Sequence, residues 1–189
     1  DAVGRRTKLG KLPLHLLLDS KGVSFEAVKV LVDAYPNGVG ESSQRKNPLH
    51  FACGESRASL EIIELLLQAY PAGVKEKSVE SMLPLHLAAA NRQPLNCIKK
   101  LVEAHPEAVS DRDRHSRMPL HHALERVAPD DVILYLLEQD RSTVKATGYY
   151  PHLPLHLAVE KNHSEDIIIA LLIAYAHQQG GRGGSAGEK

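Results

Sequence analysis

Apolar residues recur along the chain with the spacing of an amphipathic helix, in five segments that lie 35 residues apart. Counted from a marker residue, positions 3, 4, 7 and 8 are apolar in every copy, and such positions share one helical face. The markers are Ser24, Ser59, Pro94, Pro129 and Ser164. The stripe is Ala27, Val28, Leu31, Val32, Ile62, Ile63, Leu66, Leu67, Cys97, Ile98, Leu101, Val102, Val132, Ile133, Leu136, Leu137, Ile167, Ile168, Leu171 and Leu172. Serine caps helices and proline fits a first turn, so each marker predicts a helix start.

The tripeptide Pro-Leu-His precedes each of these segments. Proline at the first helical position loses no needed hydrogen bond and presets φ, so each tripeptide predicts the start of a shorter helix. One helix pair has nothing to bury its apolar stripe against, and the units are therefore predicted to stack around one continuous core. The prolines, 35 or 36 residues apart, are Pro13, Pro48, Pro84, Pro119 and Pro154.

The segments between units are polar. The second helices are predicted to end before Pro36, Pro71 and Pro106, because proline cannot continue a helix. About a dozen polar residues then lead to the next Pro-Leu-His, which predicts a surface loop or short hairpin. The expected fold class is all-α, a helical-repeat solenoid of helix-turn-helix units with short hairpin-like connectors.

These units resemble ankyrin repeats, most clearly over residues 84–90, which read Pro-Leu-His-Leu-Ala-Ala-Ala. The resemblance covers residues 1–175 and implies stacked helix pairs with hairpin-like fingers, which act mostly as protein-binding scaffolds. Two features depart from the family: the period is 35 to 36 residues where the family has 33, and the finger glycine is present only as Gly10. The other copies have Arg45, Ser81, Ser116 and Pro151.

The repeats divide the chain into five units between two flanking segments. Residues 1–12 are predicted to be the end of a preceding repeat, so the chain is expected to be a fragment of a longer array. Residues 176–189 are rich in glycine and are predicted to form a flexible tail. The predicted units are 13–47, 48–83, 84–118, 119–153 and 154–175.

Composition excludes several classes of protein. The chain has 23 basic and 23 acidic residues, and this balance gives no reason to expect nucleic-acid binding. The longest dense apolar run, residues 167–176, is too short to insert across a membrane. Cys53 and Cys97 lie among apolar neighbours, which indicates two buried thiols in a reducing compartment; a disulfide or a reactive thiol is the alternative. An intracellular protein, cytoplasmic or nuclear, is expected.

No residue pattern predicts catalysis, a cofactor or a metal. His115, His121 and His122 cluster along the chain, with His152 in the next finger, but no cysteine pair or His-Glu-x-x-His motif accompanies them. The protein is predicted not to be an enzyme, with a hydrolase or metal enzyme as the remote alternative. The repeat histidines are instead expected to bond to carbonyls of neighbouring loops; they are His15, His50, His86, His121 and His156.

Charge is unevenly distributed along the neutral chain. The connector and finger segments carry a net charge of +6, and the remainder of the chain carries −6. This difference predicts a basic edge that attracts an acidic protein partner. The alternative is a random scatter of solvated charges. The tyrosines at 149 and 150 are either exposed anchors or packed beneath the connector. The predicted contact residues are Arg45, Lys46, Arg112, Arg114, His115, Arg117, Tyr149 and Tyr150.

The fifth second helix is apolar where the first three copies are polar. Ile169 stands where those copies have Lys or Glu, and Ile173 where they have Asp, Gln or Glu. This predicts an apolar contact patch for a missing segment, a second copy or a partner, unless the tail folds over it.

The sequence thus predicts a protein–protein interaction module that presents a concave, basic-edged finger surface. The alternative is a structural spacer in a larger multidomain protein whose activity lies elsewhere. The sequence leaves the partner and the oligomeric state open.

Overall fold

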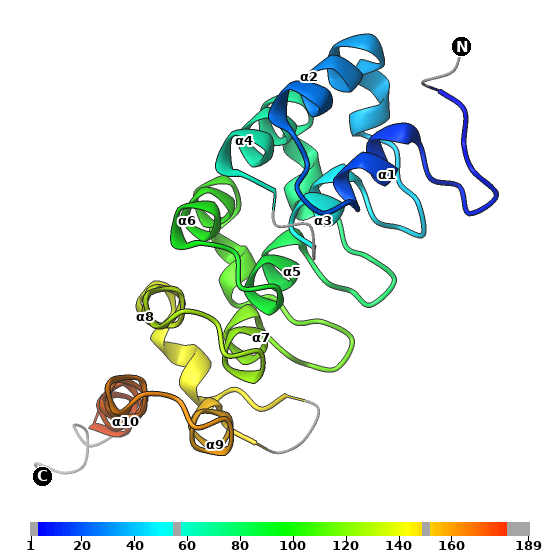
Figure 1. The fold of residues 1–189 in the computed structure, drawn as a ribbon. Helices are drawn as coiled ribbons and strands as arrows, with labels where there is room; N and C mark the ends of the chain where they lie inside the picture. The colour runs from blue at the N-terminus through cyan, green and yellow to red at the C-terminus, as the bar shows by residue number, and fades with distance from the viewer. Residues whose placement is uncertain (1–3, 55–57, 149–151, 181–189) are drawn as a thin grey trace, which may run out of the picture.

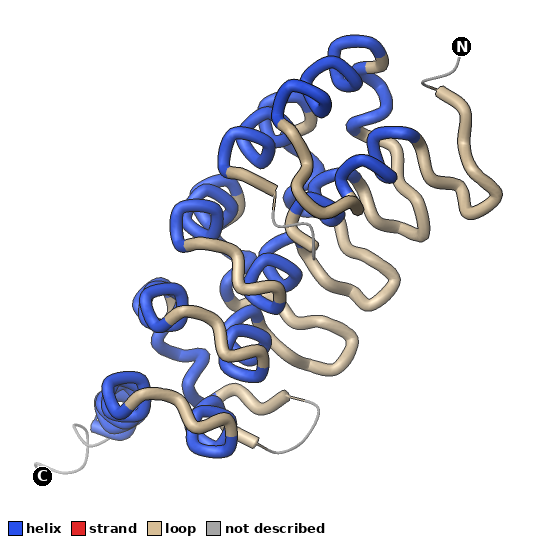
Figure 2. The backbone as a smooth tube through the Cα atoms, in the orientation of Figure 1, coloured by secondary structure: helices blue, strands red, loops and turns tan. Residues whose placement is uncertain are grey.

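The computed structural model describes residues 4–54, 58–148 and 152–180. Over these residues the chain forms ten α-helices and four short 3-10 helices and no strand, which confirms the predicted all-α class. Figure 1 shows an elongated stack in which the first helices of the units lie between a row of second helices and a row of loops. The loops project along one side of the stack, and the two termini lie at opposite ends (Figure 2).

The first helix of each unit begins at the proline of Pro-Leu-His, as predicted. In every copy, Nδ1 of the repeat histidine accepts a hydrogen bond of 3.0–3.3 Å from the backbone N–H of the residue before proline. This bond satisfies a donor at the helix start that has no partner within the helix. These helices are α1 (Pro13–Leu18), α3 (Pro48–Ala52), α5 (Pro84–Ala90), α7 (Pro119–Glu125) and α9 (Pro154–Glu160).

The second helix of each unit begins one residue after its marker. The prediction that proline markers lie within the first turn was wrong, because Pro94 and Pro129 occupy the N-cap position before it. Ser24 and Ser59 also lie at N-caps but their side chains make no capping hydrogen bond, whereas Ser164 accepts one of 3.4 Å from Ile167. The second helices are α2 (Phe25–Ala34), α4 (Leu60–Ala69), α6 (Leu95–Ala104), α8 (Asp130–Gln139) and α10 (Glu165–Gly180).

The connector after each of the first four second helices starts with a 3-10 turn, which the sequence analysis did not predict. Each turn contains a valine that is only 2–3% exposed and belongs to the core, so the connector is anchored before it reaches the surface. The turns are η1 (Pro36–Val39), η2 (Pro71–Lys75), η3 (Pro106–Val109) and η4 (Arg141–Lys145).

Each connector then folds back as a hairpin-like finger before the next Pro-Leu-His. The described fingers are residues 7–11, 43–46, 78–82 and 113–117. At the position of the finger glycine all four have φ between 56° and 74°, although three of the four residues are not glycine; Gln44, beside Arg45, also has a positive φ of 53°. The loss of the finger glycine therefore leaves the turn intact, at a conformational cost of about 1–2 kcal/mol per residue. The turn residues are Gly10, Arg45, Ser81 and Ser116; Pro151 of the fifth copy lies outside the described residues.

The apolar stripe of the second helices forms the shared core, as predicted. All stripe residues of α4, α6 and α8 are buried. The exceptions belong to the end units, where Ala27, Leu31 and Ile168 are half-buried and Leu172 is 47% exposed. Complete burial of the stripe therefore depends on a neighbouring unit on both sides.

The two cysteines lie in this core as free thiols, which confirms the prediction of buried thiols. Burial raises the pKa of Cys97 to about 11 and also raises the pKa of Cys53. Because the thiolate is the reactive form, burial and the raised pKa both disfavour reaction of either thiol in the folded chain.

The C-terminal helix is longer than predicted. α10 continues through Gly180, past the predicted boundary at residue 175, so residues 176–180 are helical and not part of a flexible tail. The remaining tail residues, 181–189, lie outside the described residues.

Candidate partner-binding site

The residues around each Pro-Leu-His form three columns that run from unit to unit. The finger column lies two residues before each proline and consists of Lys11, Lys46, Met82, Arg117 and His152. The helix column directly follows each repeat histidine and consists of Leu16, Phe51, Leu87, His122 and Leu157. The helix-end column lies three residues further on and consists of Asp19, Gly54, Ala90, Glu125 and Glu160. Members of these columns line a groove of about 470 Å³ that extends over the first four units.

Carboxylates of the helix-end column contact the finger column of the same copy. The contacts are Lys11–Asp19 (2.6 Å), Arg117–Glu125 (3.1 Å) and His152–Glu160 (3.9 Å). The second and third copies have Gly54 and Ala90 in place of a carboxylate. In the part of the chain that the structure describes, Lys46 consequently makes no ion pair.

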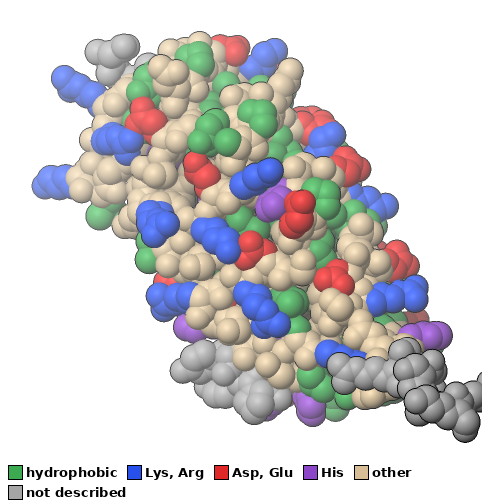
Figure 3. Space-filling model, turned by 180° about the vertical axis from the view of Figure 1, so that it is seen from behind, with side chains coloured by type: hydrophobic (Ala, Val, Ile, Leu, Met, Phe, Trp, Pro, Cys, Tyr) green, Lys and Arg blue, Asp and Glu red, His purple; other side chains and the backbone are tan. Residues whose placement is uncertain are grey.

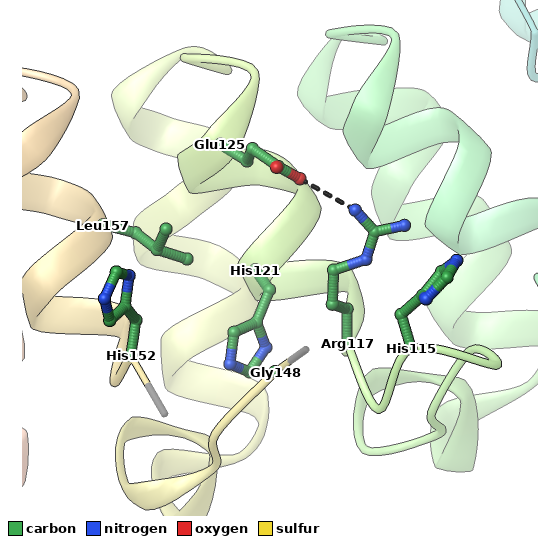
Figure 4. A pocket seen from close by; sticks show the side chains of 7 residues that line it. All are labelled: His115, Arg117, His121, Glu125, Gly148, His152 and Leu157. Atoms are coloured by element: carbon green, nitrogen blue, oxygen red, sulfur yellow. Dashed lines mark hydrogen bonds and ion pairs between the residues drawn. The ribbon is translucent and has the colours of Figure 1, made fainter. Parts of the chain in front are cut away.

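A smaller pocket of about 190 Å³ lies beside the groove, between the fourth and fifth units (Figure 4). Its lining consists of His115, Arg117, His121, Glu125, Gly148, His152 and Leu157. Arg117 and Glu125 line both the pocket and the groove, so their ion pair forms a partition between the two openings.

A buried carboxylate, that of Asp113, holds the Arg117 side chain of this partition in place. Asp113 is buried, and it accepts hydrogen bonds from Nε2 of His122 at 2.9 Å and from Nε of Arg117 at 3.0 Å. Backbone N–H groups of His115 and Arg117 donate to its other oxygen at 2.8 and 2.9 Å. Burial opposes ionisation of Asp113, but these donors outweigh it and hold its pKa below the usual value. Asp113 was not predicted as a functional residue, because nothing in the sequence distinguishes it from a solvent-exposed aspartate in a polar finger.

Three of the predicted contact cations are engaged within the protein. Nη1 of Arg112 donates to the carbonyl of Ser116 in its own finger and to that of Thr147 in the next connector, at 2.8 and 3.0 Å. The guanidinium of Arg114 lies 2.5 Å from the carboxylate of Glu80 in the preceding finger. Arg112 and Arg114 thus hold adjacent fingers together, and Arg117 ties its own finger to the end of α7, roles that their sequence positions alone did not reveal.

The remaining predicted contacts are placed differently. Arg45 is exposed at a finger turn and Lys46 is half-buried in the groove. His115 lies 3.1 Å from Arg114 and lines the smaller pocket, while Tyr149 and Tyr150 lie outside the described residues. Figure 3 shows Lys and Arg side chains along the edge that the fingers form, whereas both signs of charge mix along the opposite edge.

The histidines that lie close together in the sequence do not meet at one site in the structure. His115, His121 and His152 line the smaller pocket, but His122 faces Asp113 on the groove side. Both ring nitrogens of His121 are used by backbone groups, of Met118 and Ala146. Among the described residues, no group of histidine, cysteine and carboxylate side chains has the geometry of a metal site.

Four of the five repeat histidines contact a carbonyl of the connector or finger that follows them, as predicted. In the first four, Nε2 lies 2.9–3.2 Å from a carbonyl in the following connector or finger. Because Nδ1 accepts from a backbone N–H, the neutral ring with its proton on Nε2 satisfies both contacts in His15, His86 and His121. In His50, Nδ1 also lies 2.8 Å from Oδ1 of Asn47. Burial lowers the pKa of His50 and of His86 to about 4. The carbonyls belong to Glu41, Met82, Asp111 and Ala146.

The C-terminal unit exposes an apolar patch. Ile169 and Ile173 are 51% and 53% exposed, and Leu172 between them is 47% exposed. Leu172 was expected to be buried; its counterpart Leu137 is 5% exposed because α10 covers it. No helix in the described part of the chain is long and apolar enough to cross a membrane.

Comparison with known proteins gives one finding. A family model described as ankyrin repeats (3 copies) matches residues 57–147 and also residues 85–182. A search of curated proteins finds no match. The first unit lies before the matched region, yet it has the same proline start, histidine contacts and finger turn as the matched units.

Proposed function

The chain belongs to the ankyrin-repeat family, whose members are generally protein–protein interaction modules and typically not enzymes, and on that premise we propose that it binds a protein partner through a concave, basic-edged surface. The surface is the groove together with the exposed parts of the fingers. We propose a partner that presents acidic side chains to this edge.

The observation that carries this proposal is the open groove of about 470 Å³, whose half-buried Lys46 makes no ion pair among the described residues. A structural spacer, the alternative function, needs only the shared core and the bonds between fingers. It has no need for an unfilled groove with an unneutralised cation in it.

The finger bonds also determine which residues are suitable for a test. Reversing the charge of Arg112 or Arg114 would separate adjacent fingers, and reversing that of Arg117 would release its own finger from α7, so lost binding would have two explanations. Arg45 and Lys46 make no ion pair among the described residues, and substituting them leaves those bonds intact.

Site-specific photo-crosslinking tests the proposal. The photoreactive amino acid p-benzoylphenylalanine replaces Leu87 in the groove, where the equivalent residue Phe51 shows that a ring fits. The matched control places it at Lys29, which is exposed on α2 and does not line the groove. After irradiation in cells that express the protein, we expect discrete protein adducts at position 87, lost on Lys46→Glu, and none at position 29. A spacer would give no adducts at position 87, or the same adducts at both positions.

A further inference from the structure

The centre of the groove differs from its two ends in the charge of the helix-end column. At the N-terminal end, Asp19 accepts from Lys11, and at the other end Glu125 accepts from Arg117. Both carboxylates that line the groove are therefore already paired with a cation. The copies between them offer no carboxylate to the finger column.

Two cations of the groove are left without a carboxylate. Lys46 is half-buried in the finger wall, and Arg126 is exposed on the helix side, at the end of α7. Within the described residues, neither makes an ion pair. His50 and His122 also line the groove, but burial lowers the pKa of each to about 4, so both rings are neutral near pH 7. Among the described residues, Lys46 therefore leaves an unneutralised positive charge at the centre of the groove, and Arg126 adds a second one near the end that Glu125 marks.

Four apolar side chains line the groove together with these cations and the polar side chains of His50, Asn91 and His122. Phe51 and Leu87 come from the helix column, Met82 from the finger column and Ala90 from the helix-end column. Gly54 completes the opening: a Cβ atom there would lie 3.0 Å from the carbonyl oxygen of Phe51, a contact tighter than nearly all real Cβ contacts. Backbone packing thus disfavours any side chain at the position where the first copy has Asp19.

We propose that the groove binds a protein segment that carries a carboxylate side chain next to a large apolar side chain. The partner's carboxylate pairs with Lys46 and occupies in the second copy the place that Asp19 occupies in the first. The neighbouring apolar side chain packs on Phe51 and Leu87. This inference rests on the proposed function and specifies the partner chemistry of the same surface.

Physical considerations favour this occupant over others. A cation that is half-shielded in a groove attracts a carboxylate more strongly than one on an open surface, because less water screens the pair. The apolar lining supplies affinity that does not depend on salt. A nucleic acid would offer phosphates but no aliphatic side chain for the apolar lining, and the chain as a whole has no basic excess.

Selection from a random library tests the partner chemistry without knowledge of the partner. Phage-displayed random dodecapeptides are selected on the immobilised full chain, and parallel selections use Lys46→Gln and the control Lys29→Gln. We expect peptides enriched in Asp or Glu beside Leu, Ile, Phe or Met on the wild type and on Lys29→Gln. We expect the acidic preference to disappear on Lys46→Gln.

Affinities of the selected peptides give the decisive comparison. Labelled synthetic copies should bind Lys46→Gln at least about fivefold more weakly than the wild type, and Lys29→Gln within about twofold of it, by fluorescence anisotropy. Circular dichroism confirms that each variant is folded. The inference is overturned if no peptide is enriched, if the enriched peptides lack acidic residues, or if Lys46→Gln binds them as the wild type does. If crosslinks at position 87 persist after such a result, the proposal of an interaction module holds, and only the proposed partner chemistry is rejected.

Discussion

Acid is expected to weaken the stack through three buried histidines of the Pro-Leu-His helices. His50, His86 and His122 are neutral in the folded chain, because burial lowers the pKa of each to about 4, from 6.5 in an unfolded chain. Below pH 6.5 the unfolded chain therefore binds more protons than the folded chain. The stability that these rings contribute is fully present above that pH and is lost as the pH falls from about 6.5 towards 4.

The size of the effect follows from the shift. A ring with these two pKa values contributes about 2 kcal/mol less to the free energy of unfolding at pH 5 than at pH 7. For three rings the loss reaches about 6 kcal/mol, a large part of the 5–15 kcal/mol that stabilises a typical domain. Protonation also places a proton on Nδ1, where the ring of His86 accepts its bond from the N–H of Leu83, so the start of α5 is weakened as well.

Urea unfolding, followed by circular dichroism at 222 nm between pH 7.5 and 4.5, measures the effect. We expect the midpoint to fall steadily below pH 6.5 in the wild type. His86→Gln should be less stable at pH 7 but should lose about 2 kcal/mol less on acidification. The control His177→Gln, at an exposed position of α10, should follow the wild type. A midpoint that is constant from pH 7 to pH 5, or an identical pH dependence in His86→Gln, would refute the reasoning.

Three further outcomes are expected. Ser81→Gly should raise the free energy of unfolding by about 0.5–1 kcal/mol in urea titrations, because the turn has φ 57°; a decrease would contradict the strain at this finger. Leu137→Ala should cost about 2–5 kcal/mol and Leu172→Ala less than about 1 kcal/mol, although the two residues are equivalent in the repeat; equal costs would show that the C-terminal face is covered in solution. The thiols of Cys53 and Cys97 should react with Ellman's reagent only after denaturation, and rapid reaction of the folded chain would show that they are accessible.

The sequence predicted the parts of this fold that repeat. Pro-Leu-His specified where α1, α3, α5, α7 and α9 begin, because proline and the following histidine both act within one helical turn. The stripe predicted the shared core for the same reason, since its spacing is a property of a single helix. The valines of the 3-10 turns recur at the same period, but periodicity alone does not distinguish a buried turn from a loop.

The sequence could not predict interactions that depend on how one unit meets the next. Arg112 and Arg114 looked like partner contacts because both lie in polar fingers, and only the spacing between fingers shows that their guanidinium groups are engaged. That Lys46 makes no ion pair among the described residues likewise follows from a missing acid eight residues later, at Gly54, once the two positions are known to face each other. Leu172 carries the stripe pattern and is exposed because no described helix packs on this face of α10.

Hydrogen–deuterium exchange tests the central claim, that the groove is the partner-binding surface, most directly. Exchange is measured on the full chain, alone and with a protein captured by crosslinking at position 87. We predict slower exchange in residues 44–54 and 80–92, which contain the central groove residues, and unchanged exchange in α2, α4 and α6. Protection confined to those second helices, with none in the two groove segments, would contradict the account.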